Sequence, residues 1–180
     1  NYRVHVDFCG PFSTTNSGNT MLLVIVDSFS GYISAVPTKD ATAVTTADAI
    51  VKTWICQFGT MHWIHSDRGT NFESELLYHL CIKFGIKKTR TTAYHPSGNG
   101  RGEAAVKLTK QTLALHCKEF KNSEWDKSLP YCLMSINSGL NTSTGFTPAR
   151  LFLGREIRTP TALCVEPFND SMATDQSAYF

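Results

Sequence analysis

The 180-residue sequence lacks paired cysteine motifs, long apolar runs and a strong net charge. Its six cysteines form no Cys-x-x-Cys pair, which argues against a zinc-finger site and favours free, mostly buried thiols in a reducing compartment. No apolar stretch approaches the roughly 20 residues that span a bilayer, so we expect no membrane partner. A basic-then-apolar leader is also missing, and we expect the chain to be a segment cut from a longer protein.

The basic residues are distributed unevenly, although 17 Lys and Arg nearly balance 15 Asp and Glu and leave a net charge of +2. Between positions 81 and 121 only Glu103 and Glu119 oppose nine basic residues, which are Lys83, Lys87, Lys88, Arg90, Arg101, Lys107, Lys110, Lys118 and Lys121. Such asymmetry favours a face that binds a polyanion. The alternative is a solvated surface with scattered lysines.

The hydrophobic pattern predicts strands first and helices later. Alternation over 4–9 and apolar runs over 21–26 and 32–36, separated by short turns, predict an antiparallel meander. Helical spacing then predicts helices at 42–58, 71–84, 101–120 and 125–137, with short strands at 61–65 and 86–89. A loop is expected at 90–100, and only turns and a tail beyond 144.

This order predicts an α/β fold with a mixed five-stranded sheet flanked by helices. We expect one domain at 1–158 and a C-terminal extension or linker at 159–180. In such a sheet the first and fourth strands can be neighbours.

Three acidic residues occupy positions where they could converge. Asp7 lies in the first strand, opposite its apolar side, Asp67 follows the fourth strand, and Glu103 opens the long helix. Three carboxylates would suit Mg²⁺ or Mn²⁺, and two such ions stabilise both oxygens of a phosphodiester substitution. The alternative is structural: Asp67 caps the next helix and Glu103 favours the helix dipole.

Local motifs accompany each acid. Asp7 begins DFCGPF, Asp67 lies in HSDRGTNF, and AYHPSGNG precedes Glu103, while STGFTP and LGR follow near the C-terminus. Fifty-nine residues separate Asp7 from Asp67, and thirty-five separate Asp67 from Glu103. Together, over roughly residues 2 to 158, these features resemble the integrase catalytic core of gypsy-type retrotransposons and retroviruses, whose acids follow an Asp, Asp-35-Glu pattern.

The resemblance implies a ribonuclease-H-like fold that trims the 3′ ends of element DNA and joins them to target DNA. It implies Asp7, Asp67 and Glu103 as catalytic ligands of two Mg²⁺ or Mn²⁺ ions. Tyr94 and Asn99 match loop positions near DNA. Lys107 and Lys110 share a helix face with Glu103 and would bind phosphates; their alternative is solvent exposure. Double-stranded DNA, a homo-oligomer and a nuclear location are expected.

Glu103 has unusual neighbours for this family. Gly102 precedes it where an aliphatic residue is usual, and Ala104 and Ala105 follow it. Glycine loosens a first helical turn. The alternative function is therefore a domesticated, weakly active or inactive module that binds DNA or protein. A simple ribonuclease H shares the fold but does not require the Asn99 loop or the thirty-five-residue spacing.

Overall fold

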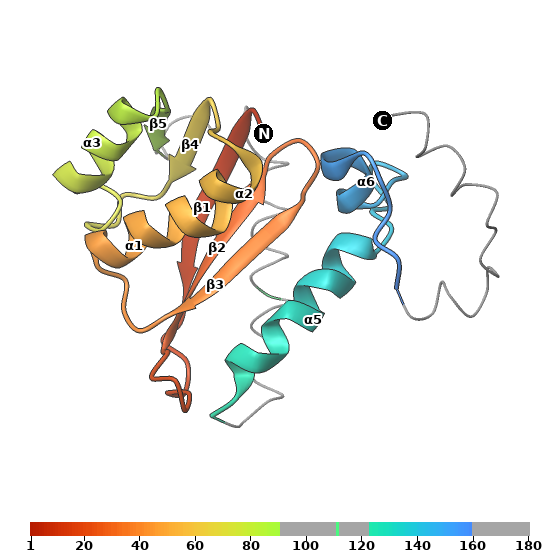
Figure 1. Cartoon of the computed structure of the whole chain (residues 1–180), viewed down its shortest axis with the longest axis horizontal. Helices are drawn as coiled ribbons and strands as arrows, with labels where there is room; N and C mark the ends of the chain where they lie inside the picture. The colour runs from red at the N-terminus through yellow and green to blue at the C-terminus, as the bar shows by residue number, and fades with distance from the viewer. Residues whose placement is uncertain (91–110, 112–122, 160–180) are drawn as a thin grey trace, which may run out of the picture.

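The computed structural model describes residues 1–90, 111 and 123–159, which form a mixed five-stranded sheet between helices (Figure 1). The strands are β1 Arg3–Cys9, β2 Met21–Asp27, β3 Ile33–Thr38, β4 Trp63–Ser66 and β5 Lys87–Arg90. The helical segments are α1 Ala43–Ile50, the π-helical η1 Val51–Ile55, α2 Cys56–Phe58, α3 Glu75–Lys83, α5 Trp125–Ser138 and α6 Pro148–Leu153. The predicted α/β architecture is confirmed.

The strand order is β3-β2-β1-β4-β5. The first three strands pair antiparallel, as the meander predicts, whereas β4 pairs with β1 and with β5 in parallel. Parallel neighbours require a crossover, and helices supply it here. The prediction that the first and fourth strands are neighbours is therefore confirmed.

Apolar side chains on both sheet faces hold the layers together. On one face Val4 and Val6 pack with Ile50 and Trp54 of the first helical run and with Leu77 of α3. On the other face, a second cluster joins β2 and β3 to α5 through Leu22, Val24, Val26, Ile33, Ala35, Trp125, Leu129 and Cys132. Figure 1 shows α1 and α5 on either side of the sheet.

A buried amide fixes α5 to the edge strand. Asn137 Nδ2 donates to the Ile33 carbonyl at 2.8 Å, and the Ile33 N–H donates to Asn137 Oδ1 at 2.9 Å. At the other end of the helix, Trp125 Nε1 donates to the Ser13 carbonyl at 2.8 Å. Both ends of α5 are thus anchored by hydrogen bonds as well as by apolar contacts.

The helix predicted at 71–84 begins later than expected. Ser74 caps α3 by accepting from the Leu77 N–H, and Phe72 lies in the preceding turn, where it is buried. Apolar spacing counted from Phe72 predicts that Leu76 faces the core, but this prediction is wrong: the buried positions of α3 are Leu77 and Cys81, and Leu76 is exposed. The cap residue sets the phase of the helix, and a turn residue had been counted into the pattern.

Helix α6 was not predicted, because only turns were expected beyond 144. Thr147 accepts from the Arg150 N–H, Pro148 occupies the first turn, and Gly154 ends the helix with a φ of 73°. This is a full set of start and stop signals around only six residues.

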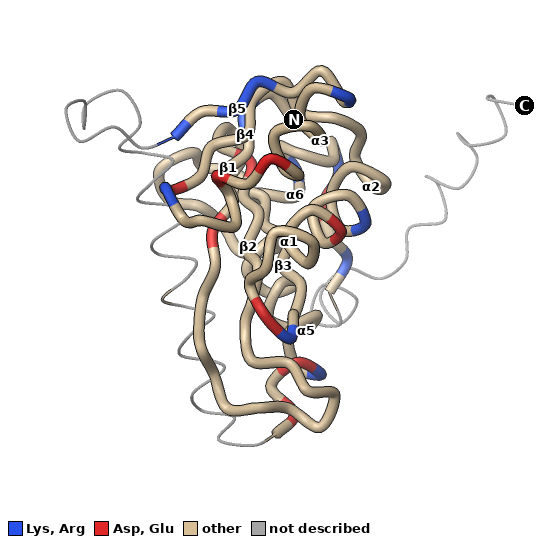
Figure 2. The backbone as a smooth tube through the Cα atoms, turned by 90° about the vertical axis from the view of Figure 1, so that its left-hand side faces the viewer, with Lys and Arg blue, Asp and Glu red and all other residues tan. Residues whose placement is uncertain are grey.

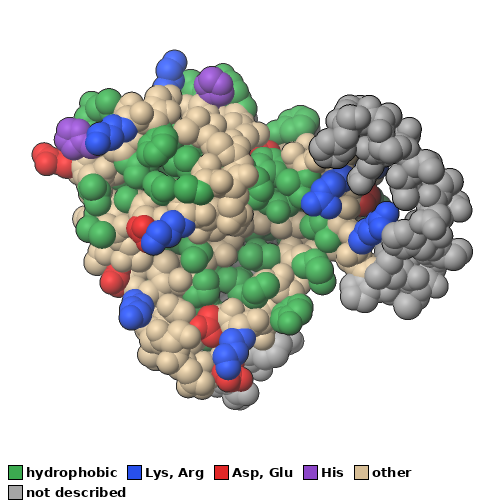
Figure 3. Space-filling model, viewed as in Figure 1, with side chains coloured by type: hydrophobic (Ala, Val, Ile, Leu, Met, Phe, Trp, Pro, Cys, Tyr) green, Lys and Arg blue, Asp and Glu red, His purple; other side chains and the backbone are tan. Residues whose placement is uncertain are grey.

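Surface apolar side chains are scattered between polar ones on the face that Figure 3 shows. Within the described ranges, no helix is both long enough and apolar enough to cross a bilayer. Apart from Arg90, which ends β5, the loop predicted at 90–100 falls outside the described residues, as do nearly all of the helix at 101–120 and most of the extension at 159–180. The division at residue 158 stays a prediction.

Candidate active site

Parallel pairing brings the first two predicted acids to one edge of the sheet. Arg3 pairs with Trp63, and two residues further His5 pairs with His65. Asp7 and Asp67 are each two residues beyond these histidines, so continuing the register makes them level at the carboxyl ends of β1 and β4. The two strands whose pairing relates the acids are therefore about 60 positions apart in the chain.

Each of these two carboxylates is held by nearby backbone. Asp7 Oδ1 accepts from the Phe8 N–H at 2.7 Å, and Asp67 Oδ1 accepts from the Gly69 N–H at 2.9 Å. Asp67 therefore does not cap α3, as the structural alternative supposed, since Ser74 does so. An ionised carboxylate has about four acceptor sites, so a backbone hydrogen bond to one oxygen is compatible with a cation bound to the same carboxylate.

Two buried histidines, His5 and His65, each precede one of the acids by two residues. The rings of His5 and His65 have centroids 4.8 Å apart, and the residues are only 5% and 9% exposed. Burial, followed by the proximity of His65 and Arg3, lowers the pKa of His5 to about 4. Thr89 Oγ1 donates to the Ile64 carbonyl at 3.2 Å and thus accepts from His65 Nδ1 at 3.0 Å, which assigns a ring proton to that nitrogen.

The turn after Asp67 is closely packed around Gly69. The Gly69 carbonyl accepts from the N–H groups of Phe72 and Glu73 at 2.9 and 3.0 Å. A Cβ added at Gly69 would lie 2.6 Å from Asn71 Oδ1 and 3.0 Å from Asp67 Oδ1. The absence of a side chain at this position therefore allows the Asp67 carboxylate to fold back onto its own loop.

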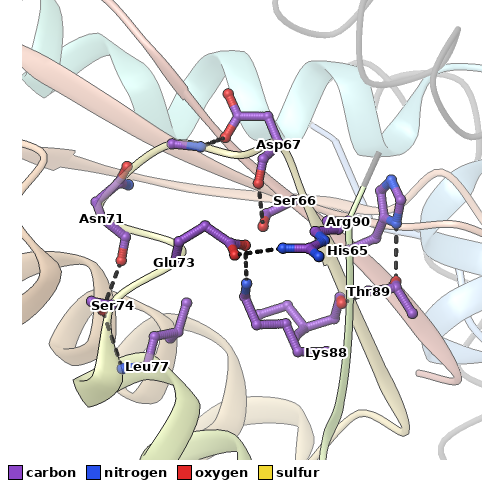
Figure 4. Close-up of polar contacts among 12 residues, drawn as sticks. His65, Ser66, Asp67, Asn71, Glu73, Ser74, Leu77, Lys88, Thr89 and Arg90 are labelled. Carbon is purple, nitrogen blue, oxygen red and sulfur yellow. Dashed lines mark hydrogen bonds and ion pairs between the residues drawn. The ribbon is translucent and has the colours of Figure 1, made fainter. Parts of the chain in front are cut away.

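Glu73 joins the same loop to β5. Its carboxylate accepts from Lys88 Nζ, and from Arg90 Nη1 at 3.1 Å (Figure 4). The hydrogen bond from Lys88 is the main reason that the pKa of Glu73 is lowered. Glu73 precedes the start of α3, and its ion pairs bridge the loop and β5. Figure 2 shows acidic and basic positions close together around β1, β4 and β5.

The remaining predicted site residues cannot be placed. Tyr94, Asn99, Glu103, Lys107 and Lys110 all lie outside the described residues. Among the residues that are described, no group of three or more His, Cys, Asp or Glu could hold a metal ion. Asp7 and Asp67 supply two hard oxygen donors, which fit Mg²⁺ or Mn²⁺ in type. The third ligand stays a prediction.

Sequence reasoning missed the contributions of Gly69, Glu73 and the histidine pair. The histidines had a visible signal, because each stands two residues before an acid on a predicted strand. The bridge from Glu73 to Arg90 had none, since it joins residues 17 positions apart through an unpredicted turn.

Asp27, the last residue of β2, has a structural role. It is buried, and its Oδ2 accepts from the N–H of Ser30 at 2.9 Å and from the Ser30 hydroxyl at 2.7 Å. These bonds close the turn between β2 and β3.

Comparison with known proteins places this fold and motif set in one family. The family model described as Integrase core domain matches residues 1–96. The Retrovirus-related Pol polyprotein from transposon 412 of Drosophila melanogaster is 27% identical over 158 residues, which cover 88% of this chain and 13% of that protein. An uncharacterized Caenorhabditis elegans protein is 33% identical over 162 residues, covering 89% of this chain and 12% of that protein. The chain thus spans about an eighth of the length of these relatives.

Solved structures agree with this assignment. The catalytic core domain of BIV integrase matches with a TM-score of 0.66 and 26% identity, covering 85% of this chain and 94% of that one. The HTLV-2 integrase catalytic core domain, solved in complex with magnesium in a trimeric form, matches with a TM-score of 0.65 and 22% identity, covering 84% and 96%. The ribonuclease-H-like fold is therefore confirmed, whereas the narrower gypsy-type assignment stays a prediction. The chain belongs to the integrase core domain family.

Proposed function

We propose that this chain is the catalytic core of a DNA integrase that trims the 3′ ends of element DNA and joins them to target DNA. The observation that carries the proposal is the parallel pairing of β1 with β4 up to His5 and His65, because Asp7 and Asp67 each follow two residues later. Membership of the integrase core domain family supports the same activity.

Asp7, Asp67 and Glu103 would hold two Mg²⁺ or Mn²⁺ ions. When bound, such ions supply activation of the attacking oxygen and stabilisation of charge on the leaving oxygen. The chain's own contribution is to fix its carboxylates. The Gly69 N–H orients Asp67, and the Phe8 N–H orients Asp7. His5 and His65, two residues before these acids, are buried from solvent.

Double-stranded DNA is the proposed substrate, as both element ends and target. We propose that Tyr94, Asn99, Lys107 and Lys110 contact it, the lysines through phosphates. A homo-oligomer and a nuclear location belong to the same proposal, because two element ends have to be joined to chromosomal DNA.

The test is strand transfer on labelled oligonucleotides with Mg²⁺ or Mn²⁺. Asp7→Asn, Asp67→Asn and Glu103→Gln should each reduce joining and nicking to background. Asp48→Asn is the matched control, because Asp48 is an exposed acid that pairs with Lys52 on the first helical run. Binding of Mn²⁺ without DNA, measured by calorimetry, gives a second readout that Asp67→Asn should weaken. Equal activity in the wild type and Asp67→Asn would contradict the proposal.

The same assay distinguishes the proposed integrase from the alternative function, which Gly102 and the alanines after Glu103 suggest. A non-catalytic DNA-binding or protein-interaction module would bind DNA but would neither nick nor join it, and its acid variants would behave like the wild type.

A further inference from the structure

One exposed arginine lies beside the proposed active site without a role in it. Arg90 ends β5, and its Cα register partner is Ser66, the residue directly before Asp67. Neighbouring strands are about 4.8 Å apart and residues rise about 3.3 Å along a strand, so the backbones of Arg90 and Asp67 lie roughly 6 Å apart. The backbone of Arg90 therefore lies at the same end of the sheet as the two acids, although strand alternation directs its side chain to the face opposite that of Asp67.

The side chain of Arg90 is oriented by Glu73. Arg90 Nη1 lies 3.1 Å from Glu73 Oε2, and Glu73 belongs to the loop that begins at Asp67 (Figure 4). A guanidinium has five N–H donors, and within the described part of the chain only Nη1 is engaged. No other residue in the described ranges engages the remaining donors, and the Arg90 side chain is 58% exposed.

The ion-pair group formed by Glu73, Lys88 and Arg90 carries one excess positive charge. One carboxylate, that of Glu73, faces the two cations Lys88 and Arg90, which leaves one positive charge. Lys88 is largely buried under the loop, so Arg90 presents that charge to solvent. An exposed, pre-oriented guanidinium suits a phosphate, because its planar fork matches two phosphate oxygens.

We propose that Arg90 is a phosphate-binding residue, which holds the DNA backbone next to the scissile phosphodiester, and that Glu73 is its positioning residue. This inference rests on the proposed function, since it takes DNA as the substrate. Phosphates follow one another at about 3.4 Å of helix axis along each strand. A phosphodiester held at Asp67 therefore has neighbouring phosphates within the reach of the Arg90 side chain.

The experiment measures binding of the 180-residue chain to a fluorescent duplex oligonucleotide in EDTA, from about 50 to about 200 mM salt. Arg90→Gln should weaken binding roughly threefold to tenfold at the low-salt end and reduce the slope of log affinity against log salt by about one. The ratio of the wild-type affinity to the Arg90→Gln affinity should then shrink about threefold to fourfold across the salt range.

Two variants separate phosphate binding from a purely structural ion pair. Glu73→Gln breaks the same pair from the other side but keeps Arg90, so it should retain the wild-type salt slope. Arg150→Gln removes an arginine of similar exposure, 54%, which faces Glu156 next to α6; it should bind DNA as the wild type does. Thermal unfolding of each variant verifies that it is folded.

A wild-type salt slope in Arg90→Gln, or the same loss in Arg90→Gln and Glu73→Gln, would overturn the inference. The outcome is independent of catalysis, because EDTA removes the metal ions. If the slopes differ as expected but no strand transfer occurs, the proposed function fails while the phosphate contact stands. If strand transfer occurs and the slopes are equal, only the inference about Arg90 fails.

Discussion

The backbone N–H of Gly69 donates to the Oδ1 of Asp67 at 2.9 Å, and a Cβ on that glycine would lie within 3.0 Å of that same oxygen. The turn that carries one proposed metal ligand thus depends on the smallest residue.

Gly69→Ala should therefore displace the Asp67 carboxylate. Its Cβ would lie 3.0 Å from Asp67 Oδ1 and 2.6 Å from Asn71 Oδ1, so both side chains have to move. Misplacement of a ligand by about 1 Å costs on the order of a hundredfold in rate, and we expect strand transfer to fall about tenfold to a hundredfold. Gly139→Ala at the end of α5 is the control. Unchanged activity in Gly69→Ala would show that the loop adapts.

Acid pH should destabilise the fold through His5. Its pKa is about 4 in the folded chain against 6.5 for an ordinary histidine, so the unfolded chain takes up a proton first as the pH falls. Stability is then complete above about pH 6.5 and falls towards pH 4, by up to about 3 kcal/mol.

Urea unfolding across that pH range, with EDTA present, measures the effect. Carboxylates also titrate at the lower end, so the informative quantity is the difference between the wild type and His5→Gln. The variant should lose less stability between about pH 6.5 and 4.5. Parallel curves would mean that His5 does not carry the effect.

Asp27→Ala should destabilise the fold without changing the metal requirement. It removes two hydrogen bonds to Ser30 in a buried turn, at a cost of about 2–3 kcal/mol. The Mn²⁺ concentration that gives half-maximal strand transfer should remain that of the wild type when measured well below the Tm. A shift in that concentration would indicate that Asp27 takes part in metal binding.

Asn137→Ala should weaken the attachment of α5 to the sheet. Both backbone groups of Ile33 lose their partner in a buried place, which costs about 2–4 kcal/mol. Ser138→Ala, at the half-buried neighbouring position, should stay within about 0.5 kcal/mol of the wild type. Chemical denaturation checks both values, and similar stabilities for the two variants would contradict this account of Asn137.

Much of the fold was accessible from local patterns. The strand around Asp7 was predicted by alternation, and the helix that ends at Gly59 by apolar spacing and a glycine stop, which takes a φ of 80°. The start of α3 was missed because Phe72 is buried like a helix-face residue although it belongs to a turn. Burial alone does not distinguish the two.

The sequence by itself determined the strands and most of the described helices, the order of the acidic motifs and their spacing, because these depend on residues close together in the chain. Only the tertiary structure decided that β4 lies beside β1, that Glu73 reaches Arg90, and that two histidines meet beneath the acids. Those relationships join distant segments. They follow from how whole apolar faces pack together, and no short window of sequence contains that information.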